Sequence, residues 1–187
     1  MTLNIKSLRL NTTVACSVGI IAACSSSSDS PSTTPTTISG SIFAAPVNGA
    51  EVSVEDMSGN TVAGPVTTNA DGTYTIDVPD SALSSDLVVK SNGGIFDDEA
   101  TDALGVGTAA GALSAFVESG SLAAGVSVHV TPSTTIHAGL VTQHGKSALA
   151  AKTAVFNAFA YNPDTSVQPV DITEPEALTA SDASRLA

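Results

Sequence analysis

Short runs of alternating apolar and polar residues, separated by turn residues, constrain the fold of this chain more than any other feature. The clearest run is 73–78, where Tyr74, Ile76 and Val78 alternate with polar residues. Successive side chains of a strand point to opposite faces, so this pattern predicts a strand with one buried face. About seven such runs between 38 and 131 predict a small antiparallel β-sandwich.

The other predicted strands follow from the same alternation and from their flanking turns. They lie at 38–43, 51–55, 61–68, 87–91, 113–117 and 126–130. The segment 69–72 ends in Asp71-Gly72, residues that tolerate the positive φ of tight turns, so we expect a hairpin there. Hydrophobic residues make up 42% of the chain, but it has five Phe, two Tyr and no Trp. The core must therefore consist mainly of Val, Ile, Leu and Ala.

Beyond residue 131 the pattern becomes helical. Thr131 supplies a capping hydroxyl directly before Pro132, which suits the first position of a helix. We therefore predict a helix over 132–143, with Ile136 and Leu140 on one apolar stripe.

A second predicted helix, 146–160, carries Leu149, Phe156 and Phe159 on its apolar stripe and ends before Asn162-Pro163. A last helical segment begins near Glu176 and reaches Ala187 without a residue that stops helices. We therefore expect the helical region 132–187 to be truncated.

The first 23 residues are typical of a secretory signal. Lys6 and Arg9 precede an apolar run, 14–23, that ends in small residues. This run is too short to cross about 30 Å of hydrocarbon as a helix, so we expect no permanent membrane span.

Residues 21–24, Ile-Ala-Ala-Cys, resemble the lipobox of bacterial lipoproteins. The resemblance implies cleavage before Cys24, diacylglycerol on its sulfur and an acyl chain such as palmitate on its new amine. Ser25 resembles the sorting residue of lipoproteins sent to the outer membrane of Gram-negative bacteria. The alternative is an ordinary signal peptide in which Cys24 is incidental.

Twelve of the thirteen residues in 25–37 are Ser, Thr or Pro. Such a segment buries too little apolar surface to offset its ordering entropy, so we expect a disordered tether. The predicted organisation is a signal peptide (1–23), a lipidated Cys with its tether (24–37), a β-sandwich (38–131) and the helical region.

Three segments of the predicted sandwich, 38–42, 46–52 and 68–74, resemble the carboxypeptidase regulatory-like family of transthyretin-type β-domains. The resemblance implies an Ig-like or transthyretin-like sandwich that acts as a surface spacer or binding domain. The run 130–136 also resembles a class of bacterial exported proteins with a β-domain and a helical continuation, where a small residue usually takes the place of His137.

Charge and cysteine content exclude several classes of function. After removal of 1–23, four basic residues face 18 acidic ones, which argues against binding to nucleic acid. Cys16 leaves with the signal peptide and Cys24 carries lipid, so no disulfide is expected. The sequence predicts no cofactor.

Candidate catalytic residues are few. His129 is expected on the exposed face of its strand, while His137 and His144 lie seven apart and could share a helical face. No zinc-ligand spacing and no Gly-x-Ser-x-Gly motif accompanies them, so we predict no enzymatic activity and no metal site. An acidic group could bind Ca²⁺ only weakly. Its members are Asp97, Asp98, Glu99 and Asp102.

Two glycine-containing segments come close to nucleotide-binding motifs. Residues 139–147 have five residues between the two glycines where a phosphate-binding loop has four, so we interpret them as a turn between helices. Residues 105–110 fit the loose dinucleotide pattern, but no predicted strand precedes them, and a loop is the better interpretation.

The sequence therefore favours a non-catalytic, lipid-anchored cell-envelope protein that displays a β-sandwich to an unknown envelope protein or carbohydrate. One alternative is an accessory part of an exported enzyme whose catalytic region lies elsewhere. Another is a Ca²⁺-dependent adhesion module that uses the acidic group.

Overall fold

The computed structural model describes residues 34–98, 107–160 and 162–170. Within them the chain is mainly antiparallel β structure followed by two helices, as predicted. The predicted signal peptide, Cys24, most of the predicted tether and the segment from Glu176 onward lie outside the described residues. The end of the predicted tether differs, because strand β1 (Thr36–Ser41) already begins at Thr36.

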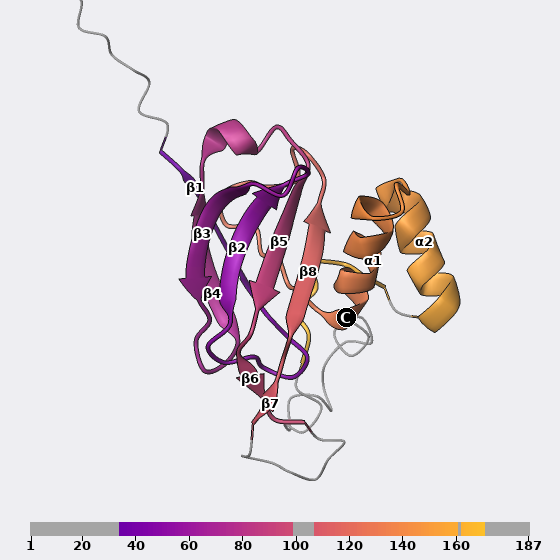
Figure 1. Ribbon diagram of the computed structural model, residues 1–187. Coiled ribbons are helices and arrows are strands. Elements are labelled where there is room, and N and C mark those ends of the chain that lie inside the picture. Colours follow the sequence, from indigo (N-terminus) through magenta and orange to yellow (C-terminus); the bar gives the residue numbers. More distant parts are fainter. Residues whose placement is uncertain (1–33, 99–106, 161, 171–187) are drawn as a thin grey trace, which may run out of the picture. The chain divides into compact units, whose positions relative to one another are not determined.

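The larger sheet has four antiparallel strands in the order β3-β2-β5-β8 (Figure 1). Their bounds are Thr61–Thr67 for β3, Glu51–Asp56 for β2, Leu87–Asn92 for β5 and Ala112–Val117 for β8. Each coincides with a predicted run to within a few residues.

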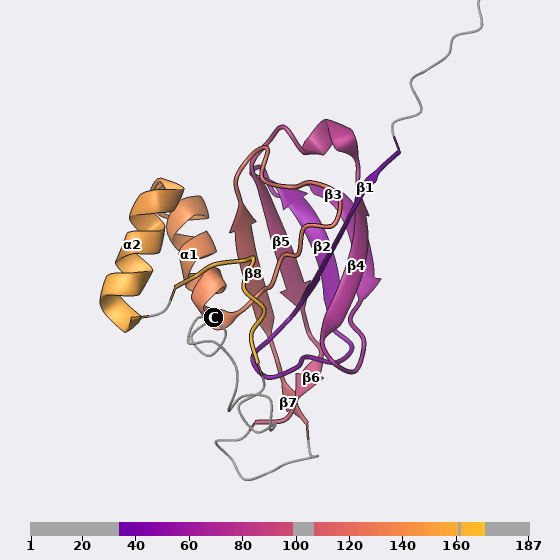
Figure 2. The same ribbon diagram turned by 180° about the vertical axis from the view of Figure 1, so that it is seen from behind.

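The second sheet is seen from the opposite side in Figure 2, where β1 lies beside β4 (Thr73–Val78). Segment 126–130 runs parallel to β1 along its other edge. Backbone bonds hold it there, among them Val128 N to Ser39 O over 2.7 Å and Val130 N to Ser41 O over 2.8 Å. A 3₁₀ turn, η1 (Asp80–Ala82), and a short pair, β6 (Ile95–Phe96) with β7 (Thr108–Ala109), complete the β region.

The two sheets share one buried core. Ile38 and Ile76 from the smaller sheet pack in the same cluster as Val52, Val54 and Val89 from the larger one. Tyr74, Ile76 and Val78 are all buried, which confirms the predicted inner face of β4. As expected from the composition, aliphatic side chains make up most of this core.

The predicted hairpin at 69–72 is wrong, although its turn is present. Asn69 N donates to Thr73 O over 2.9 Å, but β3 pairs with β2 while β4 pairs with β1. The turn therefore carries the chain from one sheet to the other. Gly72 is required in it, because its φ is +76° and a Cβ would lie 2.7 Å from the carbonyl oxygen of Ile42.

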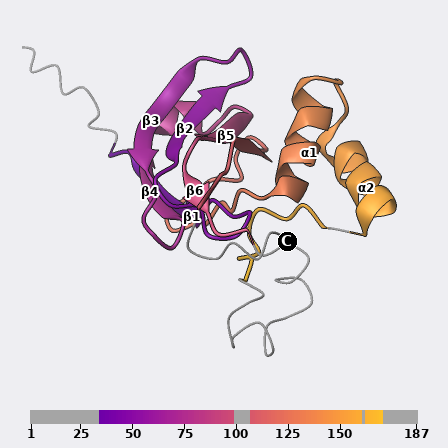
Figure 3. The ribbon, with the colours of Figure 1, turned by 60° about the horizontal axis from the view of Figure 1, so that its bottom comes forward.

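Helix α1 (Pro132–Thr142) begins as the sequence predicts. Thr131 caps it through a reciprocal pair of side-chain bonds with Thr134, and Pro132 occupies the first position. Ala138 packs on Val88 and Phe116, which lie on the outer face of the larger sheet. Figure 3 shows α1 between this sheet and α2 (Ala148–Phe159).

The start of α1 also covers the free edge of the larger sheet. Ser114 lies in β8, the last strand, and its backbone N–H donates to Thr135 Oγ1 over 2.9 Å. The hydroxyls of Thr134 and Thr135 donate back to the carbonyl oxygen of Ser114. Both polar groups that this residue presents at the edge are thereby satisfied, which blunts the edge against pairing with another strand.

The predicted apolar stripes of both helices are wrong. In α1, Ile136 is 40% exposed, and the buried residues are Ser133, Thr134, His137 and Ala138. In α2, Ala151 and Val155 are buried, and the large apolar residues lie outside. Those exposed residues are Leu149, Phe156 and Phe159. The two helices pack through small side chains, which permit a closer approach than Leu or Phe would.

Candidate functional site

The three histidines lie in three separate settings, and the prediction is wrong for the exposure of His129 and for a face shared by His137 and His144. His129 is only 6% exposed, so its expected position on an exposed strand face is wrong. His144 is exposed and lies beyond the end of α1, so it does not share a helical face with His137. His137 is 7% exposed and belongs to the buried side of α1.

His129 forms a pair with Ser41 that the sequence did not suggest. The Ser41 Oγ lies 2.8 Å from His129 Nδ1, across 88 residues of sequence. Burial lowers the pKa of His129, which keeps the ring neutral and able to accept the Ser41 proton.

This geometry resembles a nucleophile and its base, but Ser41 is only 2% exposed. No carboxylate among the described residues hydrogen-bonds the His129 ring. A hydrolase also needs access for its substrate and a group that orients the base. The pair therefore joins β1 to segment 126–130 as a structural contact.

His137 has an unsatisfied nitrogen. Its Nε2 lies 3.0 Å from the carbonyl oxygen of Ala148, at the start of α2. A carbonyl only accepts, so Nε2 carries a proton, and in the tautomer protonated at Nε2 alone the Nδ1 atom is an acceptor. That Nδ1 is buried without a hydrogen-bond partner, a rare arrangement that indicates a missing donor.

The His137 ring lines a pocket of about 250 Å³, hereafter the His137 pocket. Four separate parts of the chain form its walls: the end of β8, α1, the first turns of α2 and segment 163–165. Phe116 meets the His137 ring edge-on, with ring centroids 6.0 Å apart. Ala148, Leu149 and Pro163 add further apolar surface.

Segment 163–165 is held in place by two contacts with the rest of the fold. His129 N donates to the carbonyl oxygen of Thr165 over 2.7 Å, which fixes the segment beside 126–130. Lys152 Nζ of α2 lies 3.8 Å from Asp164 Oδ2. The Ser166 hydroxyl donates to Asp164 and, together with its backbone N–H and Lys152, lowers the pKa of that carboxyl.

The charge balance of the pocket is negative. Lys152 already pairs with Asp164, while no described residue pairs with the side chain of Glu118. One carboxylate is therefore left uncompensated at the wall of the His137 pocket.

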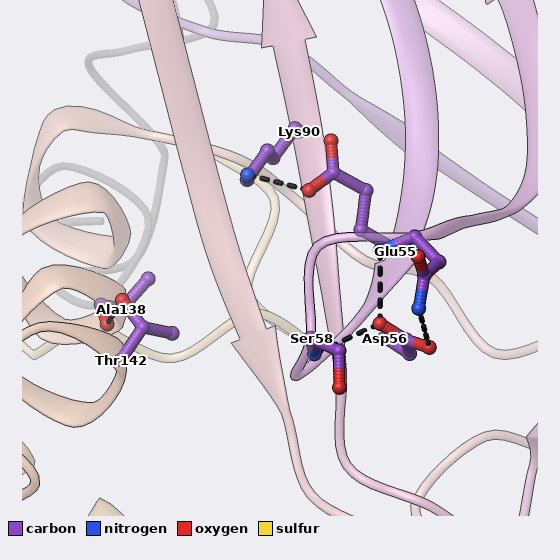
Figure 4. A network of polar contacts seen from close by, with 7 residues as sticks. Glu55, Asp56, Ser58, Lys90, Ala138 and Thr142 are labelled. Carbon is purple, nitrogen blue, oxygen red and sulfur yellow. Dashed lines mark hydrogen bonds and ion pairs between the residues drawn. The ribbon is translucent and has the colours of Figure 1, made fainter.

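A second hollow lies between the larger sheet and α1, with a volume of about 360 Å³. Several of the polar groups around it are already paired (Figure 4). Lys90 pairs with Glu55, and Thr142 donates to the carbonyl oxygen of Ala138 over 2.9 Å. Asp56 closes its own turn, accepting from Ser58 N and from Asn60. Because these groups are satisfied, this hollow offers less to a ligand than the His137 pocket.

The weak Ca²⁺ candidates are described only in part. Asp97 and Asp98 follow β6, whereas Glu99 and Asp102 lie outside the described residues. In the part of the chain that the structure describes, no three His, Cys, Asp or Glu side chains come together in a way that could hold a metal ion. The described helices also include none that is long and apolar enough to cross a membrane.

Sequence reasoning named His137 but gave it no role, and it missed the rest of the pocket. The interpretation of 139–147 as a turn between helices is confirmed for 143–147, whereas 139–142 still belong to α1; the turn brings Ala148 to His137. Comparison of the chain with protein-family models, with curated proteins and with solved structures gave no match.

Proposed function

We propose that the chain is a non-catalytic, lipid-anchored protein of the bacterial cell envelope that displays a β-sandwich binding module. The observation that carries this proposal is the order of three features. A lipobox-like 21–24 is followed at once by the Ser/Thr/Pro run 25–37, and the folded part begins at Thr36. A cysteine anchor, a spacer and a folded module in that order suit display from a membrane surface.

The resemblance to the carboxypeptidase regulatory-like family supports the proposed module. Its first motif, 46–52, enters β2 through Gly49, whose φ is +74°. Its second, 68–74, contains the turn at Gly72 and delivers Tyr74 to the core. We accordingly propose a transthyretin-type sandwich, with binding rather than turnover as its activity. The inaccessibility of the Ser41–His129 pair supports the second part of this proposal.

Metabolic labelling of the full chain with palmitate tests the anchor. Cys24→Ala should abolish the label, because no other cysteine remains after processing. Cys16→Ala is the matched control, since Cys16 lies in the predicted signal peptide and should leave labelling unchanged. The label should follow the wild-type chain into the outer-membrane fraction of a Gram-negative host. Label that persists on the Cys24→Ala chain would contradict the proposal.

A further inference from the structure

We propose that the His137 pocket binds a small organic cation with N–H donors on a flat apolar body. This proposal goes beyond membrane anchoring and does not depend on it.

The requirement for a donor comes from His137 Nδ1. The opposite nitrogen donates to the Ala148 carbonyl at 3.0 Å, so in the tautomer protonated at Nε2 alone the Nδ1 atom is an acceptor. It is buried without a partner. An unpaired buried acceptor is destabilising, and a ligand N–H that reaches Nδ1 removes that penalty.

The requirement for a flat apolar body comes from the other walls. Phe116 presents its ring near the imidazole at an interplanar angle of 70°. Leu149 and Pro163 bound the same space. A volume of about 250 Å³ is small for a ligand site, so a single ring with one polar group is the expected size.

The requirement for positive charge comes from Glu118. Lys152 is engaged by Asp164, which leaves Glu118 as the uncompensated charge of the pocket. The whole chain carries a formal charge of −12, so its long-range field also attracts cations. An anion of the same size would meet repulsion from both sources.

Nuclear magnetic resonance of the three histidine rings tests the proposal on the ¹⁵N-labelled full chain. Four probes with a single phenyl ring separate the requirements: benzamidinium (cation with N–H), benzyltrimethylammonium (a bulkier cation without N–H), benzamide (neutral with N–H) and benzoate (anion). Benzamidinium should shift His137 Nδ1 at millimolar concentration, with the other probes weaker and benzoate weakest. His144 lies outside the pocket and acts as the internal control.

Two variants assign the effect to the pocket. Glu118→Gln should raise the Kd for benzamidinium about two- to fivefold and leave that for benzamide unchanged, as expected for one exposed charge. Glu51→Gln is the control, because Glu51 is also exposed and lies outside the pocket. His137→Phe should raise the Kd for benzamidinium about tenfold, so that benzamidinium no longer binds more tightly than benzyltrimethylammonium.

Three results would overturn the proposal. The first is an unchanged His137 ring at about 10 mM benzamidinium in a folded chain, which would assign Nδ1 to water alone. The second is equal binding of all four probes. The third is an equal response of Glu118→Gln and Glu51→Gln, which remains decisive even if His137→Phe fails to fold. None of these results bears on palmitate labelling of Cys24, so the two proposals stand or fall separately.

Discussion

Gly40 lies at a position of β1 that has no room for a side chain. A Cβ there would lie 1.8 Å from the carbonyl oxygen of Val128 and 2.9 Å from Tyr74 Oη. Those two atoms are themselves joined, because Tyr74 donates its hydroxyl to Val128 O over 2.7 Å. Gly40→Ala should therefore cost about 3 kcal/mol or more in the free energy of unfolding, measured by urea denaturation.

Gly139 provides the matched control for the same substitution. It lies in α1, where a Cβ would meet no heavy atom within 4 Å. Gly139→Ala should stabilise the chain by up to about 1 kcal/mol, because alanine has the higher helix propensity. Similar urea midpoints for the two variants would show that the contact at Gly40 is not as tight as described.

His129 should make stability depend on pH. Burial lowers its pKa below the ordinary 6.5, so between those two values the unfolded chain binds more protons than the folded one. The free energy of unfolding should therefore fall as the pH drops through 6.5, by at most about 1.4 kcal/mol per pH unit, and level off below the folded pKa. Thermal denaturation between about pH 8 and pH 5.5 measures this fall.

Two histidine variants test whether His129 causes this pH dependence of the free energy of unfolding. His129→Gln cannot titrate and should flatten it, whereas His144→Gln replaces an exposed side chain and should leave it unchanged. A slope that survives in His129→Gln would place the responsible group elsewhere in the chain.

At the scale of elements, α2 offers a direct test of which face is buried. Val155 is 1% exposed and Phe156 is 56% exposed. Val155→Ala should cost about 1–2 kcal/mol by removing buried methyl groups, while Phe156→Gln should change the free energy of unfolding by less than about 0.5 kcal/mol. The apolar stripe predicted from the sequence would give the opposite order. Urea midpoints of the two variants decide between them.

The strands could be predicted because each carries its own signal. In β4, alternation alone identified Tyr74, Ile76 and Val78 as buried. The sheet to which a strand belongs leaves no such local signal, so the turn at 69–72 predicted a hairpin where the chain in fact changes sheet. The prediction of the buried helix faces failed for a related reason. The buried residues of α1 and α2 include small ones such as Ala138 and Ala151, which hydropathy ranks below Leu and Phe.

The candidate site was less predictable than the fold, since its parts are distant in sequence. Ser41 and His129 are 88 residues apart, and Phe116, His137 and Asp164 come from three different segments. The unsatisfied state of His137 Nδ1 depends on the position of every neighbouring donor. No local pattern encodes that property. The one hint in the sequence was that the polar residue His137 stands in a predicted helix directly before the small residue Ala138.

The charge of the whole molecule should make its stability depend on salt. The chain has 18 acidic and six basic residues, so like charges repel one another in the compact state. Salt screens this repulsion over a Debye length of about 10 Å at 0.1 M. The melting temperature should therefore rise as NaCl increases from about 0.02 M to 0.5 M, where screening is nearly complete.

KCl serves as the control for this effect, because screening depends on ionic strength and not on the identity of the cation. The two salts should give the same rise. A melting temperature that falls with salt, or that rises only with NaCl, would show that self-repulsion does not limit the stability of this fold.

The position of β1 determines how the folded part meets a mechanical load. β1 pairs along its length with β4 on one side and runs beside segment 126–130 on the other (Figure 2). A pull on the chain before Thr36 acts along β1. It therefore loads in shear, and at the same time, the hydrogen bonds to β4 and those to segment 126–130. Such a force reaches the fold at a strand that is held on both sides.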